Sequence, residues 1–105
     1  MKIYISGKIS GTDLTETRKR FAAVAKAMKR IGVEPVNPLE NGLTEHDSWE
    51  AHMLKDIADL LHCNAIYMLQ GWEESKGARI EHYIATKKRM PIMYEVEQPI
   101  EYDTE

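Results

Sequence analysis

Residues Ala65 to Glu81 read AIYMLQGWEESKGARIE, a hydrophobic run followed by a turn and the start of a helix. The apolar run from Ala65 to Leu69 is typical of a buried strand. Ser75 is a residue type that starts helices. In an open α/β sheet, the turn between a parallel strand and the following helix is where ligands bind. This stretch therefore predicts both the fold class and the position of a site.

Strands and helices alternate along the whole chain. Apolar residues at helical spacing in the first helix are Leu14, Phe21, Val24, Ala25, Met28 and Ile31, with Thr12 or Asp13 as its cap and Gly32 at its end. The expected order is strand 2–6, helix 14–31, strand 33–37, helix 49–62, strand 64–69, helix 75–88 and strand 91–94.

Strands that alternate with helices imply a parallel sheet covered on both faces. Right-handed crossovers favour the strand order 2-1-3-4. We therefore expect a Rossmann-like or flavodoxin-like three-layer sandwich with four or five parallel strands. Pro35 suggests that the second strand lies at a sheet edge. The loops 6–11 and 70–75, which follow strands one and three, should flank one crevice.

The chain has 105 residues, which favours one domain over residues 1–95 and an acidic tail over residues 96–105. Its net charge of −3 and scattered basic residues do not indicate a nucleic-acid partner. A single cysteine, Cys63, excludes an intramolecular disulfide and is compatible with a reducing cytoplasm. No signal peptide or membrane-spanning run is expected. These features together predict a cytoplasmic protein. The four histidines have no metal-ligand spacing, so we predict no metal.

Two carboxylates fall on faces that should be apolar. At about 100° per residue, Glu81 and Asp56 both point toward the sheet. The face of Glu81 also holds Gly77, Ala78, Ile84 and Ala85, and that of Asp56 holds Trp49, Met53, Leu60 and Cys63. A carboxylate in an apolar stripe is costly unless it is paired or functional. Each one alone is equally well a structural carboxylate with a polar partner. Two of them near the predicted crevice favour an acid, base or nucleophile.

Four further candidates each have a structural alternative. Ser75 is either a helix cap or a seat for a phosphate. The loop around Lys8 matches neither the dinucleotide fingerprint nor the P-loop, and a plain strand-to-helix connection explains its glycines. Tyr4 is either a core residue of the first strand or a partner of a neighbouring carboxylate. Trp72 is either a packing residue or a platform for a nucleobase.

The sequence also resembles a known family. The similarity spans residues 2–94 and is most specific from Asp56 to Glu81. It lies in Ile3-Tyr4-Ile5-Ser6-Gly7, Val36-Asn37-Pro38, Trp49, Met53, Asp56, Cys63-Asn64-Ala65-Ile66, Gly71-Trp72 and Ser75-Lys76-Gly77-Ala78-Arg79-Ile80-Glu81. These segments resemble short bacterial and phage domains of the nucleoside 2-deoxyribosyltransferase superfamily, similar to deoxynucleoside 5′-monophosphate N-glycosidases.

That resemblance implies a site. Glu81 takes the position of the nucleophile, and Asp56 that of the proton donor to the base. Tyr4 takes the position of the residue that holds the nucleophile and sugar, and Ser75 that of the serine that binds a 5′-phosphate. Family members are often homodimers that complete the site across the interface. We expect no cofactor.

The sequence departs from the family pattern at three positions. Asn64 stands where Asp is frequent, Lys8 where Pro is common, and His82 where Gly is usual. None of these changes removes a catalytic group, and Lys8 points mildly toward nucleotides.

We therefore expect cleavage or transfer at the N-glycosidic bond of a (deoxy)nucleoside or its 5′-monophosphate through a covalent glycosyl-glutamate. Substrate contacts are expected from Ser6, Gly7, Lys8, Trp72, Ser75 and Gly77. One alternative is a non-catalytic module that binds or senses nucleotides. Another is an interaction protein that uses the acidic residues 95–105.

Overall fold

A computed structural model describes residues 1–96 of the chain as one parallel sheet with helices on both faces. The strands are β1 (Lys2–Ser6), β2 (Glu34–Val36), β3 (Ala65–Met68) and β4 (Ile92–Tyr94). The helices are α1 (Leu14–Arg30), α2 (Trp49–Leu61) and α3 (Lys76–Lys87), with short 3-10 helices η1 (Pro38–Glu40) and η2 (Trp72–Glu74). The acidic tail predicted at 96–105 lies, from residue 97 on, outside the described residues.

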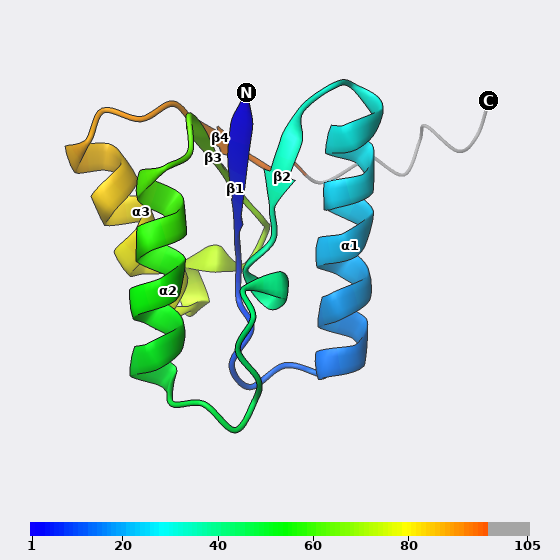
Figure 1. The fold of residues 1–105 in the computed structure, drawn as a ribbon, viewed down its shortest axis with the longest axis vertical. Coiled ribbons are helices and arrows are strands. Elements are labelled where there is room, and N and C mark those ends of the chain that lie inside the picture. Colours follow the sequence, from blue (N-terminus) through cyan, green and yellow to red (C-terminus); the bar gives the residue numbers. More distant parts are fainter. Residues whose placement is uncertain (97–105) are drawn as a thin grey trace.

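The strand order is β2-β1-β3-β4 and every pair is parallel, so the predicted three-layer α/β architecture is confirmed. Helix α1 covers one face of the sheet, and α2 and α3 lie together on the other (Figure 1). Right-handed crossovers require this arrangement, because the chain moves from β1 to β2 in one direction and from β2 to β4 in the opposite direction. The order in which strands are added to the sheet reverses between β1 and β3, which is the switch point where such sheets bind ligands.

Strand β1 divides its side chains between the two layers. Ile3 and Ile5 pack under α1 with Phe21 and Met28. Tyr4 belongs to the cluster formed with α2 and α3. Successive side chains of a strand point to opposite faces, so Ser6 shares the face of Tyr4. The central strand thus presents two hydroxyl groups to the layer that holds α3.

The helices begin where the sequence predicts. The side chains of Asp13, Ser48 and Ser75 each accept a hydrogen bond from a backbone N–H in the first turn of the helix that follows. Gly32, at φ +83°, ends the turn after α1. Strand β2 is an edge strand, as Pro35 predicts. The short helix η2 was not expected, because Gly71, at φ +89°, starts a turn that the apolar pattern does not reveal.

No helix within residues 1–96 has both the length and the apolar character needed to cross a membrane.

Candidate active site

Glu81 is buried at the centre of the site and is held by two hydroxyl groups of β1. The Tyr4 hydroxyl donates to Oε2 at 2.8 Å, and the Ser6 hydroxyl donates to Oε1 at 2.7 Å. Glu81 is 4% exposed, while Tyr4 and Ser6 are fully buried. The prediction that Glu81 faces inward is confirmed. Its two oxygens are fixed in orientation, because each accepts a bond from a different residue of a rigid strand.

Burial raises the pKa of Glu81 to about 7. The hydrogen bonds from Ser6 and Tyr4 oppose that rise in pKa, and the negative charge of Asp56 adds to it. The pKa of Tyr4 is raised well above 10, first by burial and then by the charge of Glu81. Tyr4 therefore remains a hydrogen-bond donor at any physiological pH, and Glu81 changes its charge near neutrality.

Asp56 is the second buried carboxyl group, 7% exposed on the inner face of α2. Its Oδ1 accepts a 2.9 Å hydrogen bond from the side-chain amide of Asn41, which follows η1. Burial raises the pKa of Asp56, and the Asn41 bond and nearby His52 oppose the rise. The inward orientation predicted for Asp56 is confirmed. Its carboxyl group is therefore poised to carry a proton at a higher pH than an exposed aspartate.

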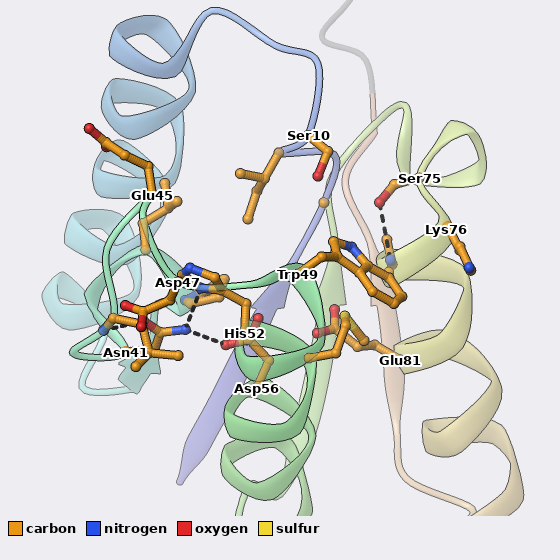
Figure 2. A pocket seen from close by; sticks show the side chains of 18 of the residues that line it. Ser10, Asn41, Glu45, Asp47, Trp49, His52, Asp56, Ser75, Lys76 and Glu81 are labelled. Carbon is orange, nitrogen blue, oxygen red and sulfur yellow. Dashed lines mark hydrogen bonds between the residues drawn. The ribbon is translucent and has the colours of Figure 1, made fainter.

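Both carboxyl groups line one cavity of about 390 Å³. That volume lies within the range of small-molecule sites. Figure 2 shows the Asn41–His52–Asp56 group on one side of the cavity and Ser75 and Lys76 on the other. The Trp49 ring lies between these two groups in that view, and Glu81 lies below it. The wall of the cavity also includes Ile9, Ser10, Arg18, Leu39, Thr44 and Met53.

The start of α3 forms one side of this cavity. The Ser75 hydroxyl accepts a 3.1 Å hydrogen bond from the backbone N–H of Ala78, so it caps the helix while its own proton is still available to a ligand. Gly77 allows α2 to approach closely, because a Cβ there would lie 3.0 Å from the sulfur of Met53. At Lys76 the side-chain nitrogen lies 4.8 Å from the centre of the Trp49 ring. This wall combines a helix N-terminus, a hydroxyl, a cation and an aromatic face.

Residues 1–94 match the family model described as Domain of unknown function (DUF4406). The chain belongs to this family. Among solved structures, it is similar to one titled "2-desoxiribosyltransferase from Leishmania mexicana", with a TM-score of 0.67 and 23% sequence identity over 97% of this chain and 69% of the other. That likeness establishes a shared fold. No curated protein matches the chain significantly in sequence.

Six of the nine predicted site residues line the cavity of this DUF4406 chain. They are Tyr4, Gly7, Asp56, Ser75, Gly77 and Glu81. Gly7 follows β1, where the backbone lies close to the core. A Cβ on this residue would lie 3.1 Å from Leu69 and 3.2 Å from Phe21, so a glycine fits here.

The other three predicted residues are placed elsewhere. Ser6 is fully buried and does not line the cavity, and its hydroxyl donates a hydrogen bond to Glu81. Lys8 forms an ion pair with Glu74 at 3.6 Å. Trp72 stacks on His82, with ring centroids 4.3 Å apart, and borders a separate hollow with Gln70, Tyr94 and Glu95.

Sequence reasoning missed Asn41, which donates a hydrogen bond to Asp56, and His52, which contacts Asn41. His52 had a signal, since it precedes Asp56 by four residues and so shares its helix face. Asn41 had none, because it comes from a loop whose path the residue pattern does not define. Trp49 lines the cavity, whereas Trp72, the predicted platform for a nucleobase, does not.

Within residues 1–96, no three side chains of His, Cys, Asp or Glu are grouped in a way that would hold a metal ion.

Proposed function

We propose that this DUF4406 protein cleaves the N-glycosidic bond of a (deoxy)nucleoside or its 5′-monophosphate. One observation carries the proposal. The Glu81 carboxyl group is held by Tyr4 and Ser6 in a cavity that a second buried carboxyl group, Asp56, also lines. Glycosidic cleavage uses such a pair, with one group at the anomeric carbon and one at the leaving group. The fold shared with a deoxyribosyltransferase and the sequence resemblance support the substrate class.

Glu81 is the nucleophile in this mechanism. Each of its oxygens accepts one hydrogen bond, which leaves a lone pair on each for attack. One oxygen forms a bond to C1′ of the sugar while the C1′–N bond breaks, and the electron pair of that bond goes to the base. Tyr4 and Ser6 hold the carboxylate in place during the attack. Orientation of this kind lowers the barrier because the reacting atoms are held together before reaction.

Asp56 is the acid in the same step. Its Oδ1 accepts a hydrogen bond from Asn41, so Oδ2 is the oxygen that carries the proton in this mechanism. That proton passes to the departing base as the electron pair arrives there. Water then attacks C1′ of the glycosyl-glutamate, Asp56 accepts the water proton, and Glu81 is released as a carboxylate. A second base in place of water would give transfer instead of hydrolysis.

The cavity wall supports contacts to the rest of the substrate. Trp49 offers an aromatic face to the base. The start of α3, with Ser75 and Lys76, offers donors and positive charge to the 5′ end of the sugar or to its phosphate. We also propose that the protein forms a homodimer that completes this site, as the family resemblance implies.

Base release from a panel of deoxynucleosides, ribonucleosides and their 5′-monophosphates tests the activity. We expect chromatography to show free base from at least one member, with loss of at least about a thousandfold in Glu81→Gln. Intact mass spectrometry of the rapidly quenched reaction should show the protein plus one glycosyl group, and peptide mapping should place it on Glu81.

The controls separate this enzyme from a binding module. Glu73→Gln changes an exposed carboxylate of the same region and should leave activity intact. Thermal stabilisation by a nucleotide with no base released from any substrate would support the sensing module instead. Full activity of Glu81→Gln would contradict the mechanism.

A further inference from the structure

Asn41 is held in a single orientation by three hydrogen bonds. Its Oδ1 accepts a 2.9 Å bond from the backbone N–H of Leu43. Its Nδ2 donates to Oδ1 of Asp56 at 2.9 Å and lies 3.2 Å from Nδ1 of His52. Asn41 is 8% exposed, so water does not compete strongly for these bonds. A flipped amide would face the Asp56 carboxyl group with an acceptor and lose all three bonds.

The tautomer of His52 follows from its other contact. Nε2 of His52 lies 2.8 Å from the backbone carbonyl oxygen of Thr44. A carbonyl oxygen only accepts, so Nε2 carries the proton and donates it. In the neutral ring Nδ1 is then an acceptor and takes the second amide hydrogen of Asn41. A chain of donors therefore runs from Asn41 to His52 and from His52 to Thr44.

We propose that Asn41, held by His52, is a positioning residue that fixes which oxygen of Asp56 delivers the proton to the leaving base. This inference rests on the proposed function and deepens it. Asn41 occupies Oδ1 with a donor, so a proton on Asp56 is restricted to Oδ2. Losing Asn41 would leave the carboxyl group free to rotate and to carry its proton on either oxygen.

Asn41 also stabilises the charged form of Asp56, since a donor to a carboxylate favours ionisation. The titratable groups that act on Asp56 are His52, Lys55 and Asp59 on α2. Glu81 on α3 is also coupled to it, since the charge of Asp56 raises the pKa of Glu81. Lys55 and Asp59 form an ion pair with each other at 2.8 Å, so their charges largely offset each other at Asp56. Asn41 is the hydrogen-bond donor that comes from outside this helix. Its removal therefore isolates the effect of that hydrogen bond on the pKa of Asp56.

Two substitutions at Asn41 test the proposal. Asn41→Ala removes all three hydrogen bonds. Asn41→Asp keeps an acceptor for the N–H of Leu43 but replaces the donor to Asp56 by a second carboxyl group. NMR titration of the Asp56 carboxyl carbon in the full chain gives the readout, with circular dichroism to verify the fold.

We expect Asn41→Ala to move the Asp56 titration upward by about 1 pH unit, and Asn41→Asp to move it further. We also expect kcat to fall about tenfold with KM changed less than about threefold, because the sugar and base contacts remain. His52→Ala removes the acceptor for Asn41 and should also lower kcat. His52→Asn places an amide oxygen at the position of Nδ1, so its kcat should stay close to that of the natural chain.

An unchanged or lowered Asp56 titration in both folded Asn41 variants would overturn the proposal. If Asn41→Ala does not fold, Asn41→Asp alone decides, because it preserves the turn at Leu43. The NMR titration requires no turnover. A protein that releases no base from any substrate therefore disproves the proposed function, while the coupling of Asn41 to Asp56 is still measured.

Discussion

The hydroxyl of Ser6 donates to Oε1 of Glu81 at 2.7 Å, although the two residues are 75 positions apart in the chain. With the Tyr4 bond to Oε2, it gives the buried carboxylate one donor for each oxygen. These two bonds offset part of the cost of burying the charge. Ser6 therefore acts on Glu81, whereas the residue pattern suggests a contact with substrate.

Ser6→Ala should raise the pKa of Glu81 above its value of about 7 by ~1 pH unit, because one donor to the charged form is lost. Less carboxylate is then present at pH 7, and kcat/KM there should fall about fivefold. The pH profile of kcat/KM measures this. Tyr4→Phe removes the other donor and should shift the acidic side of the profile, where Glu81 ionises, in the same direction. An acidic side that stays at the same pH in both variants would contradict the role assigned to these hydroxyls.

Glu81→Gln should make the protein more stable at pH 8. In the unfolded chain Glu81 loses its proton near pH 4.5, whereas in the folded chain it does so near pH 7. Between these values the native state binds more protons, so the free energy of unfolding decreases as the pH rises. The whole decrease is roughly 3 kcal/mol.

Urea denaturation at several pH values checks this prediction. The stability gain of Glu81→Gln over the natural chain should grow from pH 4.5 to 7 and remain constant above it. The exposed substitution Glu73→Gln should show no such growth. A gain that is equal at pH 4.5 and pH 8 would mean that the charge of Glu81 costs the fold nothing.

Gly77→Ala should weaken substrate binding more than it changes stability. The new Cβ would lie 3.0 Å from the sulfur of Met53, the outer part of a flexible side chain. Alanine also favours a helix over glycine by about 1 kcal/mol, which offsets the displacement of Met53. Both residues line the cavity, so KM should rise several-fold while Tm moves by no more than about 5 °C. The double variant Gly77→Ala with Met53→Ala should recover part of the lost affinity.

Two tryptophan substitutions distinguish the cavity from the core. Trp49→Ala should weaken binding of the base by about 1–3 kcal/mol, the usual worth of a base–aromatic stack. Trp72→Ala should instead lower stability, because Trp72 stacks on His82 and packs against the core under α3. Calorimetric titration with substrate into inactive Glu81→Gln, together with thermal melts, compares them. Stronger loss of binding from Trp72→Ala than from Trp49→Ala would reverse these roles.

Most of the fold could be predicted from the chain, because its elements have strong periodic patterns and clear caps. The inward faces of Glu81 and Asp56 followed from helix geometry alone. Side chains that come from irregular segments could not be placed in the same way. The turn at Gly71 carries Trp72 toward His82, and the loop after η1 carries Asn41 to Asp56. Loop paths depend on tertiary contacts that have no period in the sequence.

The alternation of side chains along β1 is equally visible in the sequence. Tyr4 and Ser6 are two residues apart in a strand, so they face the same layer. The sequence predicts a carboxylate as one possible partner of Tyr4, but for Ser6 it predicts a contact with substrate. Pairing of β1 with β3 and packing of α3 on the same face together bring Ser6 to Glu81.

The wide separation of Tyr4 and Ser6 from Glu81 along the chain has a consequence for folding kinetics. Closing a loop of more than 70 residues carries an entropic cost that only later contacts recover. The bonds at 75 and 77 positions of separation should therefore form late, after β1 and β3 have paired. Until then Glu81 is an ordinary, solvated glutamate. A nascent or partly folded chain would thus carry no reactive nucleophile, and the unusual titration of Glu81 would report completion of the native state.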